Sequence, residues 1–546
     1  MELIASILLG CAAPEATEPA PAPDPVVEDT APAEPPVPRT LLSAVEVLER
    51  VSLDLRGARP TIEEIERVEA DPAALDALIE ELLLDPRFPA RIRDLWSTIY
   101  LTRSDYFYVG AEAYGQTDEA AFARAVGEEP LYVLSQIVAE DLPYTDIVMG
   151  DWSMADETIG RAWSTDYPTD ATGWRKVRYT DGRPAAGVLA TNGLWWRYGT
   201  NESNANRGRA NAISRILLCE DYLAKGVSFD RNINLLDQGA VNDALRSNPG
   251  CVACHATLDP FASYLWGFYY IDYDSAADTT PYHPEREPYW TEVTEVAPGY
   301  YGVPGYDLAD LGRQIAADPR LPACVVDQAR SLFVGRDSTL DDTTELTRLR
   351  EVLLANDLRL RPLISAVVAS DDYRAASVDG GGRKLLSSDQ LSTVIEDLTG
   401  YRFTYGGYDM LATDEYGLRT LAGGVDGVYS TRRAATATAT MALVLERVSQ
   451  AAASHVVEAD QANPSAPRLF TEVALTATPQ SDPEGFARQV QALHLRIYGK
   501  RVAADGAEVA ANAALWTDLY TLEGSGPRAW AGLLSVLLRD PDFLFY

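Results

Sequence analysis

Apolar residues along much of this chain recur every three or four positions, which is the period of an amphipathic helix. Phe486, Val490, Leu493 and Ile497 are spaced in this way. They follow Ser-Asp-Pro-Glu at residues 481–484, which has the cap, the early proline and the acid typical of a first helical turn. Convincing strands with alternating apolar and polar residues are few, so the pattern predicts a mainly α protein.

Other parts of the chain carry the same helical signal. Two more apolar faces consist of Leu308, Leu311 and Ile315, and of Val325, Ala329 and Leu332. Gly335 follows the second face, at the place where a glycine often ends a helix. Residues 431–448 are rich in Ala and Leu, which have high helix propensity. Residues 157–200 and 272–306 lack this period and are rich in Tyr and Gly, so we expect long irregular loops there.

Short sequence echoes indicate two related helical parts. Residues 41–57 begin with Leu-Leu-Ser and end with Asp-Leu-Arg-Gly, and residues 385–400 begin with Leu-Leu-Ser and end with Asp-Leu-Thr-Gly. Leu-Asp-Pro-Arg-Phe at 84–88 is matched by Arg-Asp-Pro-Asp-Phe at 539–543, with a looser copy at 369–373. Each of these follows an apolar helix, so each is interpreted as a helix stop with an aromatic side chain tucked back.

The predicted boundary between the two parts is Val-Asp-Gly-Gly-Gly at residues 378–382, which has the composition of a flexible hinge. We therefore predict a multi-helix domain over residues 39–377 and a second helical domain over residues 383–546. The echoes are too irregular for a solenoid of stacked repeats.

The first residues end a short apolar run with Leu-Leu-Gly-Cys, which has the form of a bacterial lipobox. In this interpretation residues 1–11 are a lipoprotein signal peptide, and Cys11 becomes the lipidated N-terminus. An ordinary frayed N-terminus is the alternative, because the segment carries Glu2 and no Lys or Arg. Residues 12–38 are almost entirely Ala, Pro, Glu, Asp, Thr and Val, a composition that cannot bury a core and predicts a disordered tether.

The charge of the chain excludes two kinds of partner. Lys and Arg number 46 against 81 Asp and Glu, which gives a formal net charge of −35. Affinity for phosphate comes mostly from Lys and Arg, so nucleic acid is not an expected partner. Anionic lipid surfaces would repel such a chain, and no stretch is long and apolar enough to span a bilayer. We expect membrane attachment only through the lipid anchor, in the cell envelope, facing the periplasm or on the cell surface.

Residues 251–255 read Cys-Val-Ala-Cys-His, which is the CxxCH pattern of covalent c-type haem attachment. The thiols of Cys251 and Cys254 can add to the two vinyl groups of one haem, and His255 can place an imidazole on the iron as the proximal ligand. Other uses of CxxC are a thioredoxin-like redox pair and half of a zinc site. A second CxxC and a preceding strand are both missing from the sequence, so the motif predicts one haem c.

The residues after the motif bear on the shape of this site. Asp259-Pro260 predicts the start of a new element, so the two cysteines are expected in a turn or short helix. Residues 261–270 are rich in Phe, Tyr and Trp. This cluster could form an apolar wall for the haem, or it could be plain core packing.

The distal ligand decides much of the chemistry, because Met raises the potential, His lowers it and an open position permits reactions with small molecules. Met154 lies in an aromatic-rich segment and His283 lies in the predicted loop after the motif, and these two are the tentative distal ligands. His494 falls between two leucines of a predicted helix and is assigned a structural role. His455 is placed at the end of an Ala-rich helix, where a cation suits the helix dipole.

Two cysteines remain after lipid and haem have been assigned, namely Cys219 and Cys324. In an oxidising envelope compartment such a pair can form a disulfide. The alternative is two buried free cysteines, which behave as small hydrophobic residues. The sequence leaves these two possibilities open.

Several segments together carry a family resemblance. They are RVSLDLRGARPT at 50–61, DLPYT at 141–145 with DWSM at 151–154, RGR at 207–209 with ILLC at 216–219, NPGCVACH at 248–255 with LDP at 258–260, and AC at 323–324 with LFVGR at 332–336 and the segment 364–373. Their order resembles the planctomycete-type cytochrome-like proteins, which are assembled from domains of unknown function around a CxxCH. The C-terminal end at 537–544 is similar to another helical module of that group.

The resemblance implies a secreted or envelope c-type cytochrome-like protein, without implying a known reaction. Many relatives carry Met just before the Asp-Pro that follows the haem motif, where this chain has Leu258. A ligand from that position is therefore ruled out here.

Three hypotheses about function follow. The first is a lipid-anchored c-type cytochrome that passes single electrons to an envelope redox partner, whose identity the sequence does not give. The second is a haem enzyme with an open distal site for peroxide or oxygen chemistry. The third is a surface-binding or structural lipoprotein module, whose Tyr- and Trp-rich loops grip a polysaccharide or a protein. Whether the protein is an enzyme stays open at this point.

Overall fold

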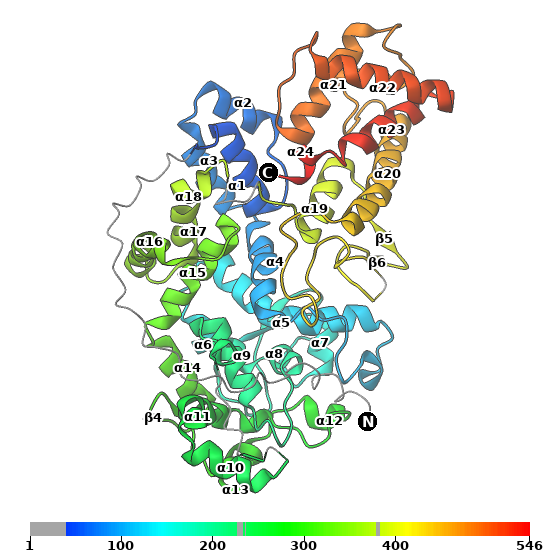
Figure 1. Cartoon of the computed structure of the whole chain (residues 1–546). Coiled ribbons are helices and arrows are strands. Elements are labelled where there is room, and N and C mark those ends of the chain that lie inside the picture. Colours follow the sequence, from blue (N-terminus) through cyan, green and yellow to red (C-terminus); the bar gives the residue numbers. More distant parts are fainter. Residues whose placement is uncertain (1–39, 227–232, 235, 378–382, 416) are drawn as a thin grey trace, which may run out of the picture. The chain divides into compact units, whose positions relative to one another are not determined.

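The structure is a computed structural model of the chain, and it describes residues 40–226, 233–234, 236–377, 383–415 and 417–546 (Figure 1). Helices hold 58% of these described residues and strands hold 4%. The prediction of a mainly α protein is therefore confirmed. The predicted signal peptide with Cys11, the tether and the hinge at 378–382 lie outside the described residues.

The elements up to residue 226 are mostly helices, with η marking a short 3₁₀ helix. They are α1 (Ala44–Arg56), α2 (Ile62–Ala70), α3 (Ala74–Leu83), α4 (Phe88–Tyr100), η1 (Ala111–Tyr114), α5 (Glu119–Ala139), α6 (Asp146–Met149), β1 (Ser153–Ala155), α7 (Glu157–Ala162), β2 (Arg175–Val177), η2 (Gly187–Ala190), α8 (Asn192–Arg197), α9 (Arg207–Leu218) and η3 (Tyr222–Ala224).

The following elements extend to residue 374. They are α10 (Gln238–Ser247), α11 (Pro249–Ala262), η4 (Ser263–Phe268), α12 (Ala276–Thr279), η5 (Pro284–Tyr289), α13 (Trp290–Val293), β3 (Gly299–Tyr300), β4 (Val303–Pro304), α14 (Leu308–Ala316), α15 (Arg320–Val334), η6 (Leu340–Asp342), α16 (Thr343–Ala355), α17 (Leu360–Val368) and α18 (Asp371–Arg374).

The C-terminal part begins after residue 382. It contains α19 (Ser388–Thr399), β5 (Thr404–Tyr405), β6 (Tyr408–Asp409), α20 (Ala439–Ala462), α21 (Pro483–Tyr498), α22 (Ala507–Glu523), α23 (Gly526–Leu537) and α24 (Pro541–Leu544). Throughout the described parts the strands form antiparallel pairs only, namely β1 with β2, β3 with β4 and β5 with β6.

The first sequence echo corresponds to two helices with the same caps. Ser43 before α1 and Ser387 before α19 both form capping boxes, in which side chain and backbone satisfy each other's donors at the helix start. The helices are 13 and 12 residues long, and they end at Gly57 and Gly400. Both glycines have a φ near +70°, a left-handed conformation that glycine adopts without a steric penalty. The repeated spacing thus encodes two helices of nearly equal length.

Two of the three copies of the second echo, at 369–373 and 539–543, correspond to the short helices α18 and α24, which close the two parts, whereas the copy at 84–88 leads into α4. Leu41 before α1 forms an antiparallel bridge with Ala375 after α18, and Leu385 before α19 forms one with Phe545 after α24. Each part therefore joins its first residues to its last by the same kind of bridge. Residues 40–546 nevertheless form one compact unit, so the division into two domains stays a prediction.

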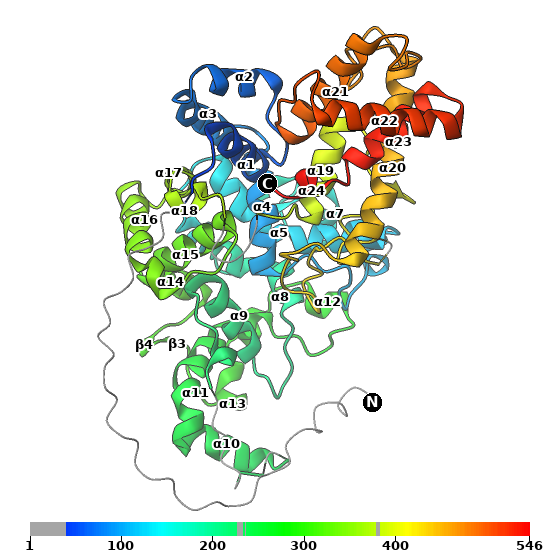
Figure 2. The same ribbon diagram turned by 45° about the horizontal axis from the view of Figure 1, so that its top comes forward.

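Two main hydrophobic clusters underlie this arrangement. The first is built from residues 47–373 together with Leu495, and the second from residues 386–544 together with Leu53. Within the second, α20 packs on α23 and α23 packs on α22, as both views show (Figures 1 and 2). Burial of apolar side chains on this scale is the main favourable contribution to folding. None of the helices in the described ranges is both long and apolar enough to cross a membrane.

Helix α5 is the longest helix of the first part, with 21 residues. It packs against α4, α7, α8 and β1. Two successive carboxylates, Glu128 and Glu129, are buried along it. Buried carboxylates require partners, and Glu128 pairs with Arg103 while Glu129 accepts hydrogen bonds from Ser153 and Tyr179.

The predicted helix over residues 431–448 is wrong in its first part, because α20 begins only at Ala439. The side chain of Thr438 accepts a hydrogen bond from the backbone of Met441 and so caps the helix. A threonine hydroxyl can bind backbone N–H groups in place of a backbone carbonyl. This explains why a run rich in Ala and Thr is not helical over its whole length. His455 consequently lies in the interior of α20 and not at its end.

The two regions predicted to be irregular contain short elements. Residues 157–200 include α7, β2, η2 and α8, and residues 272–306 include α12, η5, α13 and the β3–β4 pair. None of these elements exceeds six residues. Elements of that length are too short to show a hydrophobic period, which is why the sequence pattern does not predict them.

Candidate cofactor site on helix α11

Helix α11 contains the whole CxxCH motif. Asn248 caps it, since its side chain accepts a hydrogen bond from the backbone N–H of Gly250 at 3.0 Å. The helix continues to Ala262, so the prediction of a new element at Asp259-Pro260 is wrong. Pro260 lacks the N–H that would bind the carbonyl of Ala256, but Ala256 is exposed and water can satisfy that oxygen.

The two cysteines of the motif are free and half-buried. Cys251 and Cys254 are three residues apart on one helix, so their side chains leave it on the same side. Cys254 also contacts the first hydrophobic cluster. Both thiols are therefore partly accessible and close to apolar surface.

His255 is held in one orientation by two linked ion pairs. Its Nδ1 lies 2.8 Å from Oδ1 of Asp259, one turn further along α11. Arg207 of α9 donates to both oxygens of the same carboxylate, at 2.7 and 3.0 Å. Burial raises the pKa of Asp259, but the hydrogen bonds from His255 and Arg207 outweigh it and hold the pKa below its usual value. The carboxylate is ionised and accepts the Nδ1 proton, which leaves Nε2 of His255 as the nitrogen available to a metal.

A cavity of about 890 Å³ opens beside His255. Its described walls include Val252, Asp259 and Asn242, together with Val296 from the segment before β3. This volume lies in the range of pockets that hold small molecules and cofactors. As far as the described residues show, nothing in the cavity forms a hydrogen bond with Nε2 of His255.

The tentative distal ligands lie elsewhere. Met154 is buried in β1, where its backbone pairs with Lys176 of β2. The ring of His283 is engaged at both nitrogens, with Nε2 2.8 Å from the carbonyl oxygen of Asp278 and Nδ1 3.0 Å from Oε1 of Glu285. Neither residue is among those that line the cavity at His255. Their assignment as distal ligands stays a prediction.

The aromatic residues after the motif belong to the core. Phe261 and Phe268 are buried in the first cluster, and their rings pack edge-on against Tyr300 and Tyr282, with centroids 5.6 and 4.9 Å apart. None of the four rings lines the cavity at His255. Of the two interpretations of this cluster, the structure shows core packing.

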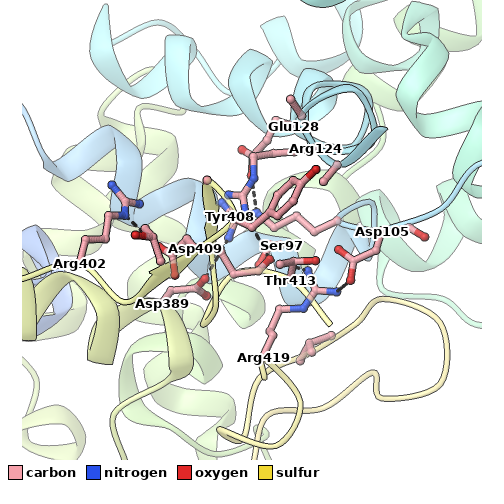
Figure 3. A pocket seen from close by; sticks show the side chains of 18 of the residues that line it. Ser97, Asp105, Arg124, Glu128, Asp389, Arg402, Tyr408, Asp409, Thr413 and Arg419 are labelled. Carbon is pink, nitrogen blue, oxygen red and sulfur yellow. Dashed lines mark hydrogen bonds and ion pairs between the residues drawn. The ribbon is translucent and has the colours of Figure 1, made fainter. Parts of the chain in front are cut away.

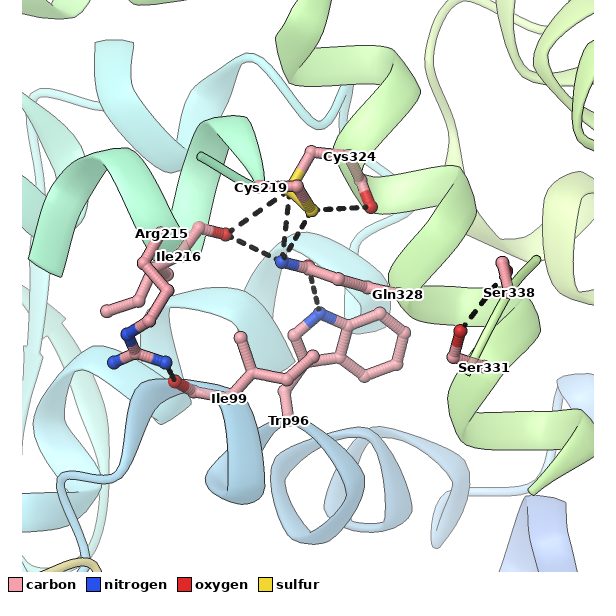
Figure 4. The surroundings of a disulfide bond; sticks show 9 residues. All are labelled: Trp96, Ile99, Arg215, Ile216, Cys219, Cys324, Gln328, Ser331 and Ser338. Carbon is pink, nitrogen blue, oxygen red and sulfur yellow. Dashed lines mark hydrogen bonds between the residues drawn. A yellow bond between two sulfur atoms is a disulfide. The ribbon is translucent and has the colours of Figure 1, made fainter. Parts of the chain in front are cut away.

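A disulfide joins Cys219, at the end of α9, to Cys324 of α15 (Figure 4). Gln328 fills the space beside it, donating from Nε2 to the carbonyl of Ile216 at 2.7 Å and accepting from Nε1 of Trp96 at 3.2 Å. The two cysteines are 105 residues apart, so α11 lies inside the closed loop. Disulfides persist in oxidising compartments.

Asp259 and Arg207 are the site residues that the sequence analysis does not identify. The spacing of His255 and Asp259, four positions apart on one helix, is a local signal that could have indicated their contact. Arg207 has no such signal, because it precedes Asp259 by 52 residues and reaches it only through the packing of α9 on α11. Within the described ranges, no three His, Cys, Asp or Glu side chains are grouped to hold a metal ion.

Comparison with known proteins gives one match. A family model described as "PSCyt2: Protein of unknown function (DUF1549)" matches residues 24–168, which is less than half of the chain. No curated protein and no solved structure matches. The name of the family points to cytochrome-like proteins and gives no function. It supports the predicted resemblance for this N-terminal part, while the CxxCH motif on α11 lies outside the matched residues.

Proposed function

We propose that this protein is a c-type cytochrome-like electron carrier that holds one haem through Cys251, Cys254 and His255. The observation that carries the proposal is a pair of linked contacts, in which Arg207 binds the carboxylate of Asp259 and this carboxylate binds Nδ1 of His255. An imidazole whose Nδ1–H is fixed by a carboxylate is the arrangement that usually stands behind a metal-bound histidine. Among the described residues it leaves Nε2 of His255 without a hydrogen-bond partner beside a cofactor-sized cavity.

The residues present fit a covalently attached haem. Two free thiols leave α11 on one side, and the histidine that follows them directly is already oriented. A haem bound there supplies a reversible one-electron iron couple. Asp259 keeps His255 in one tautomer and one orientation, and Arg207 keeps the carboxylate charged and in place. These residues would thus hold the imidazole that binds the iron, and the haem would exchange electrons with an envelope redox partner.

The proposal extends to the compartment. The Cys219–Cys324 disulfide supports an oxidising envelope location, and Cys11 is the proposed site of a lipid anchor. Replacing Cys11 by Ser should release the protein from the membrane fraction and prevent labelling with a radioactive fatty acid. If the variant stayed in the membrane fraction and still took up the fatty acid, the proposed anchor would be contradicted, while the haem proposal would be unaffected.

A second candidate function is favoured by the walls of the cavity. His255 is the one histidine among the described residues that line it, and methionine is absent from that set. An open distal position permits small-molecule chemistry, so a haem enzyme acting on peroxide or oxygen is the alternative. Its signature would be a high-spin absorption spectrum and rapid binding of external ligands, against a low-spin spectrum for the electron carrier.

The test of the proposed function is haem staining on a denaturing gel after expression with the c-type maturation machinery. The wild type should stain, and the Cys251→Ala/Cys254→Ala variant should not. Val252→Ala, in the same helical turn, is the matched control and should stain like the wild type. Staining retained in the double variant, or lacking in the folded wild type, would overturn the proposal.

A further inference from the structure

A second cavity, of about 420 Å³, lies between the first and the C-terminal part of the chain (Figure 3). It shares no described lining residue with the cavity at His255. One wall is formed by the end of α4, the loop after it and the start of α5. The other wall is formed by the start of α19, the β5–β6 pair and the loop that follows it. Its size lies in the range of small-molecule sites.

The walls of this cavity carry charges of both signs in equal number. Its arginines are Arg103, Arg124, Arg402, Arg419 and Arg433, and its acids are Asp105, Asp118, Glu128, Asp389 and Asp409. Most are paired: Arg103 lies 2.5 Å from Glu128, Arg402 lies 3.0 Å from Asp409 and Arg419 lies 3.2 Å from Asp105. These pairs hold hydrogen-bond donors and acceptors side by side in fixed positions.

Arg124 differs from the other lining arginines. It is exposed on α5, and its guanidinium donates to the backbone carbonyl of Ala412 at 3.2 Å. None of the carboxylates that the structure describes forms an ion pair with it. One cation at the cavity is therefore available to an anionic group of a ligand, and a guanidinium binds a carboxylate through two parallel hydrogen bonds.

Polar atoms deeper in the cavity lack partners as well. The side chain of Thr413 is 4% exposed, and its hydroxyl has no hydrogen-bond partner among the described residues. Oε2 of the buried Glu128 also lacks a hydrogen-bond partner among the described residues, although it forms an ion pair with Nε of Arg93 at 3.5 Å. A buried polar atom left unpaired costs about 1–3 kcal/mol, so these positions favour a ligand that brings hydroxyl groups.

We propose that this cavity binds a sugar acid, that is, a hydroxylated ring of hexuronate size with a single carboxylate. Its carboxylate would pair with Arg124, and its ring hydroxyls would meet Thr413, Glu128 and Asp389. The balanced charge of the walls and the net charge of −35 both disfavour a polyanion. One free cation beside acceptor-rich walls instead matches one acid group on a polyhydroxylated ring. This site is independent of the proposed haem function.

The test is isothermal titration of the full-length protein with D-galacturonate and D-glucuronate. Glucose, which lacks the acid, and cyclohexanecarboxylate, which lacks the hydroxyls, are the comparison ligands. At least one hexuronate should bind about tenfold more tightly than either of them, because each lacks one set of contacts. Arg124→Gln should reduce the affinity for the hexuronate to that for glucose. Thr413→Val should lower the affinity for the hexuronate and for glucose alike.

Arg432→Gln is the matched control, since Arg432 is exposed and lies outside the cavity lining. Arg124 is exposed too, so its variant should keep the wild-type circular dichroism and melting temperature. The proposal is overturned if the folded wild type binds neither hexuronate, or if Arg124→Gln binds as well as the control. Equal binding of cyclohexanecarboxylate would also overturn it, because the site would then recognise only an anion.

Discussion

Glu129 shows at the scale of one residue how this fold treats a buried charge. Its carboxylate accepts hydrogen bonds from the hydroxyl of Ser153 at 2.9 Å, the hydroxyl of Tyr179 at 2.6 Å and the backbone N–H of Gly193 at 2.8 Å. Burial nevertheless raises its pKa to about 7, because the three hydrogen bonds lower it by less than burial raises it. The group therefore titrates near neutral pH and links stability to pH.

The sign of this linkage gives a prediction for Glu129→Gln. Between pH 4.5 and about 7 the folded chain holds a proton that the unfolded chain releases, so the contribution of Glu129 to stability falls as pH rises. The contribution is fully present below pH 4.5 and is lost by about pH 7, a change on the order of 3 kcal/mol. Urea unfolding of wild type and variant at several pH values should show curves that diverge over this window; parallel curves would contradict the account.

Asp259 gives a second prediction at this scale, which rests on the proposed haem. Asp259→Asn replaces a charged acceptor by a neutral one, so His255 becomes a weaker donor to iron and the reduction potential should rise. We expect a tenfold change in the ratio of reduced to oxidised protein, equivalent to ~60 mV for one electron. Redox titration measures it. Asp243→Asn, an exposed position on α10, is the control, and an equal shift there would show that Asp259 has no specific role.

At the level of single helices, the sequence predicts those for which the capping residues and the hydrophobic period indicate the same bounds. Helices α14, α15 and α21 follow the apolar faces identified in the sequence, and Gly335 and Asp482 occupy the expected caps. The end of α11 is predicted wrongly because Asp259-Pro260 has the local signal of a helix start, whereas the helix continues through these residues and packs against α9 and η4. Tertiary packing thus overrides a local signal at the very place where the site is built.

The disulfide between α9 and α15 gives a prediction for these elements. Cys219→Ala/Cys324→Ala should lower the free energy of unfolding by about 2–4 kcal/mol, since the bond constrains a long loop of the unfolded chain. Chemical denaturation measures the change, and the wild type in a thiol reductant should match the variant. An unchanged midpoint in both would contradict a stabilising role. Haem staining of the variant should persist, because the thiols of Cys251 and Cys254 are untouched.

At the scale of the whole molecule, Asp54 of α1 ties together distant parts of the chain. Its carboxylate lies 2.6 Å from Nζ of Lys384, and it accepts from the hydroxyls of Tyr373 at 2.9 Å and Tyr546 at 2.8 Å. Both views place the C-terminus beside α1, in agreement with these contacts (Figures 1 and 2). Burial lowers the pKa of Lys384 to about 8, although Asp54 acts in the opposite direction. The two predicted domains share this buried polar group.

Asp54→Asn should therefore destabilise the whole unit. It leaves Lys384 buried without its counter-charge, which costs about 3 kcal/mol or more. Asp76→Asn is the control, because Asp76 is exposed and its pair with Arg374 is of the surface kind that contributes little. Thermal unfolding compares the two variants. Equal melting temperatures would contradict the structural role of Asp54.

The organisation of the molecule is predictable from the sequence only in part. The echoes indicate two related modules, and in each module a bridge, at Leu41 or at Leu385, joins the first residues to the last. The contacts of Asp54 are not predictable, because they join residues more than 300 positions apart. The same holds for Arg207 at the candidate site and for the cavity around Arg124, both of which arise only when separate elements pack together.

The most direct test of the central claim is the mass of the proteolytic peptide that contains residues 251–255, taken from protein matured in an oxidising compartment. The account predicts that this peptide carries one haem, bound through thioethers to both Cys251 and Cys254. A peptide with two unmodified thiols, or with a disulfide between Cys251 and Cys254, would contradict it.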